Sequence, residues 1–271
     1  MKVLRVFPRR TSFTPTDALA FVGDPPLLRP AADEIRVSCT FTWDKTKAER
    51  LQQAWGQYYD KVLLGGPAYA SPCDDFTPGL YVRPGVTFTS RGCNHQCPWC
   101  LVPEREGKLR LLDPIIPGNI IQDNNLLQAP RPHIEKVFAM LRGQRAIEFA
   151  GGLETDLVID WIAEALAGLR VKQIFLACDS DGQVQALRQA VKRLHHFGRD
   201  KLRCYVLLGY RGESMERGLA RLEAVWEAGA MPFAQCYQPP HLKQIEYSDE
   251  WRHLARFWSR PAAMKAMHAP K

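Results

Sequence analysis

Cys93, Cys97 and Cys100 are separated by three and by two residues, and this spacing is the strongest chemical signal in the chain. Cysteine thiolates bind zinc and iron–sulfur clusters. A structural zinc ion needs four ligands, and the only nearby candidate for the fourth is His95, which lies between two of the cysteines. Three thiolates on a short loop suit a 4Fe-4S cluster better, because they hold three irons and leave the fourth with open coordination. Such an iron can bind a substrate or a cofactor.

The composition describes an ordinary folded protein. The chain has 271 residues, of which 46% are hydrophobic and 24% are charged, so disorder, collagen and a small disulfide-stapled fold are excluded. No apolar run approaches the roughly 18 residues that span a bilayer, and no apolar segment follows Arg9-Arg10 as an export signal would require. We therefore expect a cytoplasmic protein with reduced thiols and no membrane partner. The net charge of +7 permits a nucleic acid partner without demanding one.

Residues 1–75 are predicted to form a small α/β domain. Apolar or alternating runs predict strands at 3–7, 34–43 and 61–64, and a helical face that begins after Asp44 lies between the last two. Residues 14–32 contain four prolines and are expected to form an irregular loop.

Residues 76–240 show a second pattern, in which short strand-like runs alternate with helical faces. Six runs are rich in β-branched or aromatic residues, at 86–89, 119–122, 146–149, 173–177, 202–208 and 232–237. The predicted fold class is therefore α/β, with a partial (β/α)6 TIM-like barrel rather than a closed eight-stranded one. Residues 241–271 are predicted to add a C-terminal helical extension that frays after Pro261.

Loops that follow the carboxyl ends of barrel strands carry the active groups. The cysteine loop follows the first predicted barrel strand. The next four strands are followed in turn by Asp123, Asn124 and Asn125, by Gly151, Gly152 and Glu154, by Asp179 and Ser180, and by Gly209 and Tyr210. The first three of these sets also have structural interpretations, as an Asn-rich turn, a glycine turn before a helix and a helix start.

The spacing Cys93-x3-Cys97-x2-Cys100, with Trp99 before the last cysteine and a βα repeat around it, resembles the radical S-adenosylmethionine superfamily. The resemblance covers residues 86–240. The preceding Ser90-Arg91-Gly92 makes the motif most similar to the branch with an amino-terminal cobalamin-binding-type domain and to methylthiotransferases. The resemblance implies a 4Fe-4S cluster on the three thiolates and S-adenosyl-L-methionine chelated by the open iron. It also implies a 5′-deoxyadenosyl radical and a one-electron donor such as flavodoxin or ferredoxin.

The resemblance further implies roles for the loops after the second and third barrel strands. The Asp123–Asn125 segment stands where the superfamily usually has a Gly-Gly-Glu type motif, and its Asp123 and Asn125 would supply acceptors for the ammonium group of the cofactor. On the third strand, Gly151-Gly152-Leu153-Glu154 is an imperfect Gly-Gly-Glu motif that would line the site.

The loops after the fourth and fifth strands would contact the rest of the cofactor. Asp179 and Ser180 would hydrogen-bond the methionyl carboxylate or the ribose hydroxyls. The segment with Gly209 and Tyr210 resembles the one that packs against adenine, where a glycine lets the backbone approach a flat ring closely.

The amino-terminal domain departs from the related pattern. Cobalamin-binding domains of the base-off type carry an Asp-x-His-x2-Gly signature, and no histidine precedes His95 here. About 75 residues also supply too few strands for a full five-stranded nucleotide-binding fold. We expect a shortened relic that does not bind cobalamin through a histidine.

The leading hypothesis is a radical S-adenosylmethionine enzyme that modifies an unidentified substrate, with a nucleic acid base as one candidate. One alternative is a non-catalytic iron–sulfur or zinc protein that binds nucleic acid. A second is a methyl or methylthio transferase, although only Cys39 and Cys73 precede Cys93 to hold a second cluster. Cys178, Cys204 and Cys236 are predicted to be packing residues, and the role of Cys73 stays open.

Overall fold

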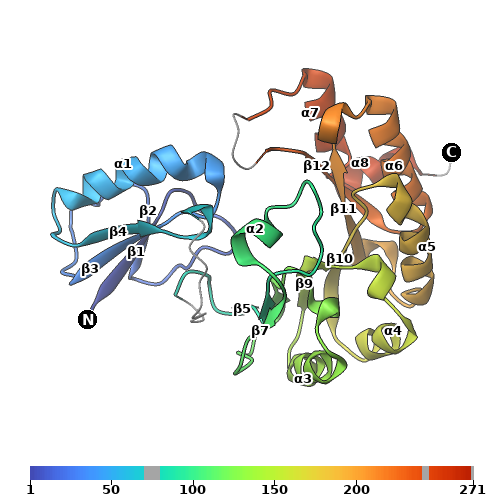
Figure 1. Ribbon diagram of the computed structural model, residues 1–271, viewed down its shortest axis with the longest axis horizontal. Helices are drawn as coiled ribbons and strands as arrows, with labels where there is room; N and C mark the ends of the chain where they lie inside the picture. Colours follow the sequence, from blue (N-terminus) through green and yellow to red (C-terminus); the bar gives the residue numbers. More distant parts are fainter. Residues whose placement is uncertain (70–79, 240–243, 270–271) are drawn as a thin grey trace.

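The computed structural model describes residues 1–69, 80–239 and 244–269, and it has a mixed α/β architecture with two parallel sheets (Figure 1). The boundaries predicted after residues 75 and 240 lie outside the described residues, and so does Cys73. Among the described helices, none is long and apolar enough to pass through a membrane.

The amino-terminal residues build the first sheet, whose parallel strands lie in the order β2-β1-β3-β4. The strands are β1 (Val3–Phe7), β2 (Ala20–Val22), β3 (Glu34–Ser38) and β4 (Val62–Gly65). Helix α1 (Lys45–Gly56) packs on this sheet through Ala48, Leu51 and Trp55, which are fully buried. The three strands and the helix predicted for this part of the chain are confirmed.

Two details of the first sheet differ from the prediction. Strand β2 lies within residues 14–32, which were expected to be irregular. It pairs with the free edge of β1 and so provides partners for backbone groups there. Strand β3 ends at Ser38, so Phe41 and Trp43, which alternate like strand residues, lie beyond it, at the start of and within a 3-10 helix (Thr42–Asp44). The side chains of Phe41 and Trp43 are therefore not part of the sheet.

The second sheet has six parallel strands in the order β12-β11-β10-β9-β8-β5. They are β5 (Val86–Thr87), β8 (Ile120–Ile121), β9 (Ile147–Leu153), β10 (Val171–Ala177), β11 (Leu202–Leu208) and β12 (Met231–Cys236). The helices between the later strands are α3 (Arg131–Arg142), α4 (Asp160–Ala167), α5 (Val184–Arg193) and α6 (Met215–Glu227). All six predicted strands are present, and the α/β class is confirmed.

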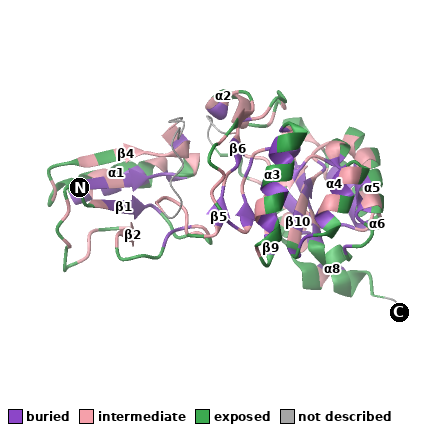
Figure 2. Ribbon diagram, turned by 90° about the horizontal axis from the view of Figure 1, so that it is seen from below, coloured by how far each residue is buried: buried purple, intermediate pink, exposed green. Residues whose placement is uncertain are grey.

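Each of these helices buries a mainly apolar stripe and exposes the opposite face, as Figure 2 shows for α3 by the change from purple to green. In α3 the stripe includes Val137, Phe138 and Leu141, and the ring of Phe138 meets that of Phe149 in β9 edge-on at 6.2 Å between centroids. Because strands that follow one another in the chain are neighbours in the sheet and run the same way, the loops after them lie along one edge.

A small hairpin interrupts the βα repeat just after β5. Its antiparallel strands are β6 (Ser90–Arg91) and β7 (Arg110–Leu111), and helix α2 (Val102–Glu106) lies between them. The cysteine segment enters directly from β6 and leaves into α2. It is thus held at the carboxyl edge of the second sheet.

The C-terminal extension is helical, but its predicted frayed tail is wrong. Helix α7 (Asp249–Phe257) is followed by α8 (Pro261–Met267), and Met264 in α8 is fully buried. His268 then stacks on Trp226 of α6 at 4.2 Å between ring centroids. Proline at the first helical position favours such a start, so Pro261 begins a helix here instead of ending one.

Candidate functional site

The three cysteines of the motif lie on the loop between β6 and α2. Cys93 and Cys97 are half-buried and Cys100 is exposed, and none of them is in a disulfide bond. The base of the loop is fixed by the backbone of the hairpin, where the Cys93 amide donates to the carbonyl of Gly107 at 3.1 Å. Across the loop, the Cys100 amide donates to the Cys97 carbonyl at 2.9 Å. Among the described residues, no three His, Cys, Asp or Glu side chains are arranged as a metal-binding group.

The surroundings of Cys97 and Cys100 oppose the ionisation of these two thiols. Burial raises the pKa of Cys97, and the neighbouring Cys100 and Cys93 sulfurs raise it further. Although Cys100 as a residue is exposed, its sulfur is partly covered, and this desolvation raises the pKa of the thiol against a backbone amide that lowers it. Because like charges repel, a bound iron or zinc ion would favour the thiolate form of cysteines that lie this close together. The chemistry of this donor set therefore fits a metal or an iron–sulfur cluster.

The loop after β8 locks the start of the cysteine segment in place. The buried carboxylate of Asp123 accepts hydrogen bonds from the Thr89 amide at 2.7 Å, from the Thr89 hydroxyl at 2.5 Å and from the Ser90 hydroxyl at 2.7 Å. Next to it, the side-chain oxygen of Asn124 accepts from the Gly92 amide at 3.0 Å. Burial raises the pKa of Asp123, while the bonds from Thr89 and Ser90 lower it. Asp123 thus has a structural role, and its predicted contact with an ammonium group stays a prediction.

Glu154 lies at the centre of a polar network beside the cysteine loop. It accepts hydrogen bonds from the Asn125 amide at 2.7 Å and from the Gln128 amide at 3.1 Å, and its other oxygen is 2.7 Å from Nε2 of His95. The Gln128 side-chain oxygen in turn accepts from the backbone amide of Asn94 at 2.8 Å. The structure therefore brings the predicted residues Asn125 and Glu154 together with the loop. His95 is directed to Glu154.

One atom of this network has no partner. The side-chain oxygen of Asn125 is buried and has no hydrogen bond within the described residues, while its amide nitrogen is 3.9 Å from the Cys93 sulfur. A buried acceptor without a donor costs free energy, so it is suited to receive a donor from a ligand. Of the residues predicted to bind the cofactor, Asn125 thus has a buried side-chain oxygen that is free to accept a hydrogen bond from a ligand.

Gly151 permits a close crossing between β9 and the loop after β8. A Cβ on Gly151 would lie 1.9 Å from the carbonyl oxygen of Asp123, closer than any real contact. The interpretation of Gly151 and Gly152 as a turn before a helix is wrong, because both lie inside β9. Glycine is needed here for the approach that brings Glu154 to Asn125.

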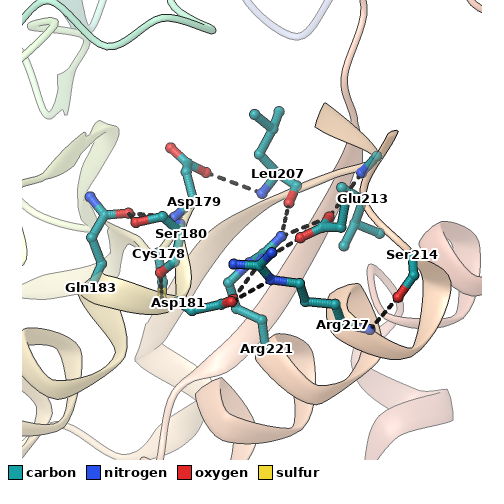
Figure 3. Close-up of polar contacts among 12 residues, drawn as sticks. Cys178, Asp179, Ser180, Asp181, Gln183, Leu207, Glu213, Ser214, Arg217 and Arg221 are labelled. Carbon is teal, nitrogen blue, oxygen red and sulfur yellow. Dashed lines mark hydrogen bonds and ion pairs between the residues drawn. The ribbon is translucent and has the colours of Figure 1, made fainter. Parts of the chain in front are cut away.

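Asp179 and Ser180 follow β10, and Figure 3 shows them beside the end of β11. Asp179 accepts a hydrogen bond from the Leu207 amide at 3.1 Å, and its burial raises its pKa. The hydroxyl of Ser180 forms a capping box with Gln183 at the start of a short 3-10 helix. The helix-start interpretation is therefore confirmed for Ser180. The side chain of Trp99, from the cysteine loop, acts against burial and lowers the pKa of Asp179.

A buried arginine ties the loops after β10 and β11 to helix α6. The guanidinium of Arg221 donates to Glu213 at 2.6 and 3.0 Å, to Asp181 at 2.8 Å and to the Leu207 carbonyl at 2.5 Å (Figure 3). Glu213 also accepts from the Gly209 amide at 3.0 Å. This cluster fixes the positions of both loops, and no feature of its sequence spacing predicted it.

Gly209 and Tyr210 lie between the cysteine loop and the C-terminal extension. Gly209 has a φ of +73°, and a Cβ there would lie 2.7 Å from the ring of Tyr247. A flat ring does approach this glycine, but it belongs to the chain itself; the predicted adenine contact stays a prediction. The ring of Tyr210 forms T-shaped contacts with the rings of Trp99 and Tyr237, at 5.5 Å and 4.9 Å between centroids. Tyr247 escaped prediction because it lies far along the chain, outside the βα repeat.

The other described cysteines behave largely as packing residues. Cys178 and Cys204 are fully buried in the core of the second sheet, as predicted, and Cys39 is fully buried in the first. Cys236, at the end of β12, is only half-buried.

In comparisons with known proteins, no family model and no curated protein matches this chain.

Proposed function

We propose that the chain is a radical S-adenosylmethionine enzyme with a 4Fe-4S cluster on Cys93, Cys97 and Cys100. The observation that carries this proposal is the spacing of the three thiols on a loop at the carboxyl edge of a sequentially ordered parallel sheet. When bound, the cluster and S-adenosyl-L-methionine would supply a 5′-deoxyadenosyl radical for hydrogen abstraction. A flavodoxin or a ferredoxin is the proposed one-electron donor.

The same proposal interprets the second sheet as a partial (β/α)6 barrel. It is supported by the strand order, which follows the chain from β5 to β12, and by the helices that link β8 to β12. In barrels of this kind the functional groups lie at the carboxyl ends of the strands. The loops with Asn125, Glu154 and Asp179 all leave that edge.

Each residue around the thiols then has a distinct proposed task. The open side-chain oxygen of Asn125 accepts a hydrogen bond from the ammonium group of the cofactor, and Glu154 orients Asn125 by binding its amide. Asp123 and Asn124 hold the start of the cysteine loop. Asp179 and Ser180 are proposed to contact the carboxylate or the ribose, and Gly209 and Tyr210 the adenine.

The proposed function is tested by cofactor cleavage. The full chain, reconstituted anaerobically with iron and sulfide and treated with dithionite and S-adenosyl-L-methionine, is expected to form 5′-deoxyadenosine, measured by liquid chromatography. Metabolite, DNA and RNA pools added in parallel would reveal a substrate by raising the yield. A colourless protein that contains one zinc ion and forms no 5′-deoxyadenosine would instead support the non-catalytic alternative.

Replacing Asn125 with leucine is expected to raise the KM for S-adenosyl-L-methionine by roughly 10- to 100-fold, the usual effect of losing a hydrogen bond to a charged group. Leucine keeps the size of the side chain but removes its acceptor and also the amide that binds Glu154, which keeps the Gln128 and His95 contacts, so the iron content should not change. Asn119→Ala is the control, because Asn119 donates to the Ala146 carbonyl and precedes β8 at its other end. A normal KM in the Asn125 variant would show that this oxygen does not receive the ammonium group.

A further inference from the structure

The connections of the first sheet diverge at the carboxyl ends of β1 and β3. These two strands are neighbours, but the chain runs from β1 to β2 on one side and from β3 to β4 on the other. Where connections part in this way, a parallel sheet leaves a crevice in which ligands commonly bind. The residues that leave this point are Pro8–Thr14 after β1 and Cys39–Asp44 after β3. In both Figure 1 and Figure 2, β1 runs toward the part of the molecule that holds the second sheet.

The loop after β3 presents two stacked aromatic rings at this point. Phe41 and Trp43 lie 4.7 Å apart between ring centroids with an angle of 11° between their planes. Phe41 is half-buried, whereas 48% of Trp43 is exposed. Phe41 covers one face of the indole, and the exposed part of Trp43 is open to solvent. The pair therefore forms a rigid platform whose outer ring is accessible.

The loop after β1 adds positive charge beside this platform. Arg9 binds the buried carboxylate of Asp44 through two hydrogen bonds of 2.5 and 2.6 Å, and its guanidinium carbon lies 5.8 Å from the centroid of Phe41. Asp44 thus fixes Arg9 and neutralises its charge. Arg10, the next residue, is exposed and has no ion pair within the described residues. It therefore adds an exposed positive charge to the loop that carries Arg9.

We propose that Trp43 and Arg10 form a binding site for single-stranded nucleic acid, in which a base stacks on the indole and a phosphate binds the guanidinium. Proteins that bind single strands combine these elements, since every base has a π-face and every nucleotide a negative charge. The chain's net charge of +7 is consistent with such a ligand. The site rests on the first sheet alone. A nucleic acid strand bound there would lie at the edge of this sheet that faces the cysteine loop. The site therefore suggests single-stranded nucleic acid as the substrate class of the proposed enzyme.

Binding is measured with the full chain by the fluorescence anisotropy of labelled single-stranded DNA and RNA oligonucleotides, without iron or S-adenosyl-L-methionine. Trp43→Ala is expected to weaken binding by roughly 5- to 150-fold, the effect of losing one base–aromatic stack. Arg10→Ala is expected to reduce the slope of log K against log salt by about 1, because one phosphate contact is lost. Competition with free nucleotides distinguishes a mononucleotide site, which they would occupy fully, from a strand site, which they would barely occupy.

Tyr58→Ala is the matched control. Tyr58 is 52% exposed, follows the C-terminal end of α1 and carries the guanidinium of Arg29 over its ring at 3.9 Å, so it is a similar aromatic–arginine pair at the other edge of the sheet. Its loss should leave binding unchanged. Equal affinities of the wild type and the Trp43 variant would overturn the proposal, as would an equal loss in the Tyr58 variant. Trp43-dependent self-association in sedimentation without oligonucleotide binding would also overturn it. Because no cofactor is present, the result is independent of 5′-deoxyadenosine formation.

Discussion

Replacing Cys97 with serine is expected to leave the reconstituted protein without its iron–sulfur cluster and to reduce 5′-deoxyadenosine formation to the level of a protein-free control. A hydroxyl does not ionise at neutral pH and is a poor ligand for the soft iron of such a cluster. The same result is expected for Cys93 and Cys100, since two thiolates cannot hold three irons. Iron and sulfide analysis, visible absorbance and product chromatography measure the effect.

Cys236→Ser is the control for this experiment. Cys236 is also half-buried, but it ends β12 and does not belong to the cysteine loop. It should retain the full iron content and activity. A Cys97 variant that still binds iron and still forms 5′-deoxyadenosine would contradict both the ligand assignment and the proposed function. Circular dichroism distinguishes loss of the cluster from loss of the fold.

Replacing Arg221 with methionine is expected to lower the free energy of unfolding by about 3–5 kcal/mol. Methionine fills much of the same volume but leaves Glu213, whose side chain is only 10% exposed, with a buried charge and no counter-ion. It also leaves the Leu207 carbonyl without its donor. Asp181 is 44% exposed and can return to water, so it contributes less. Urea denaturation followed by fluorescence measures the change.

Arg217→Met is the control that distinguishes the effect of losing a buried arginine on stability from the effect of losing an exposed one. Arg217 also binds Asp181, at 2.6 Å, but its side chain is 67% exposed. Exposed ion pairs contribute little, so its loss should cost less than about 1 kcal/mol. If the two variants had similar stabilities, Arg221 would not be the residue that holds the loops after β10 and β11 together. The Arg221 variant should also weaken the hold on Gly209, because Glu213 accepts from its amide.

The fold was predictable wherever periodicity carried the information. Apolar runs identified all six strands of the second sheet and three of the four in the first, because buried strands need such residues regardless of their context. Strand β2 was missed because its three residues form a very short apolar run within a segment of four prolines, and only its pairing with β1 identifies it as a strand. Helix α8 was missed because Pro261 was interpreted as an end when it stands at a start.

The candidate site was predictable only in part, because sequence spacing reveals neighbours along the chain and not across it. The rule that functional groups follow parallel strands placed Asn125 and Glu154 near the cysteines, and the structure brings them there. It could not show that the Asp123 carboxylate accepts hydrogen bonds from Thr89, because that contact depends on how closely two loops approach each other. Tyr247 and Arg221 reach the site from other elements, and only tertiary structure reveals them.

Strand order in the second sheet matches the order of synthesis, from β5 to β12. Each new strand can therefore pair with one that the ribosome has already released, without waiting for a distant partner, and such local pairing favours rapid folding. The cysteine loop emerges near the beginning of this series, whereas β10 and β11, whose loops carry Asp179 and Gly209, emerge later. The three thiols proposed to hold the cluster are thus translated before the loops that are proposed to surround them.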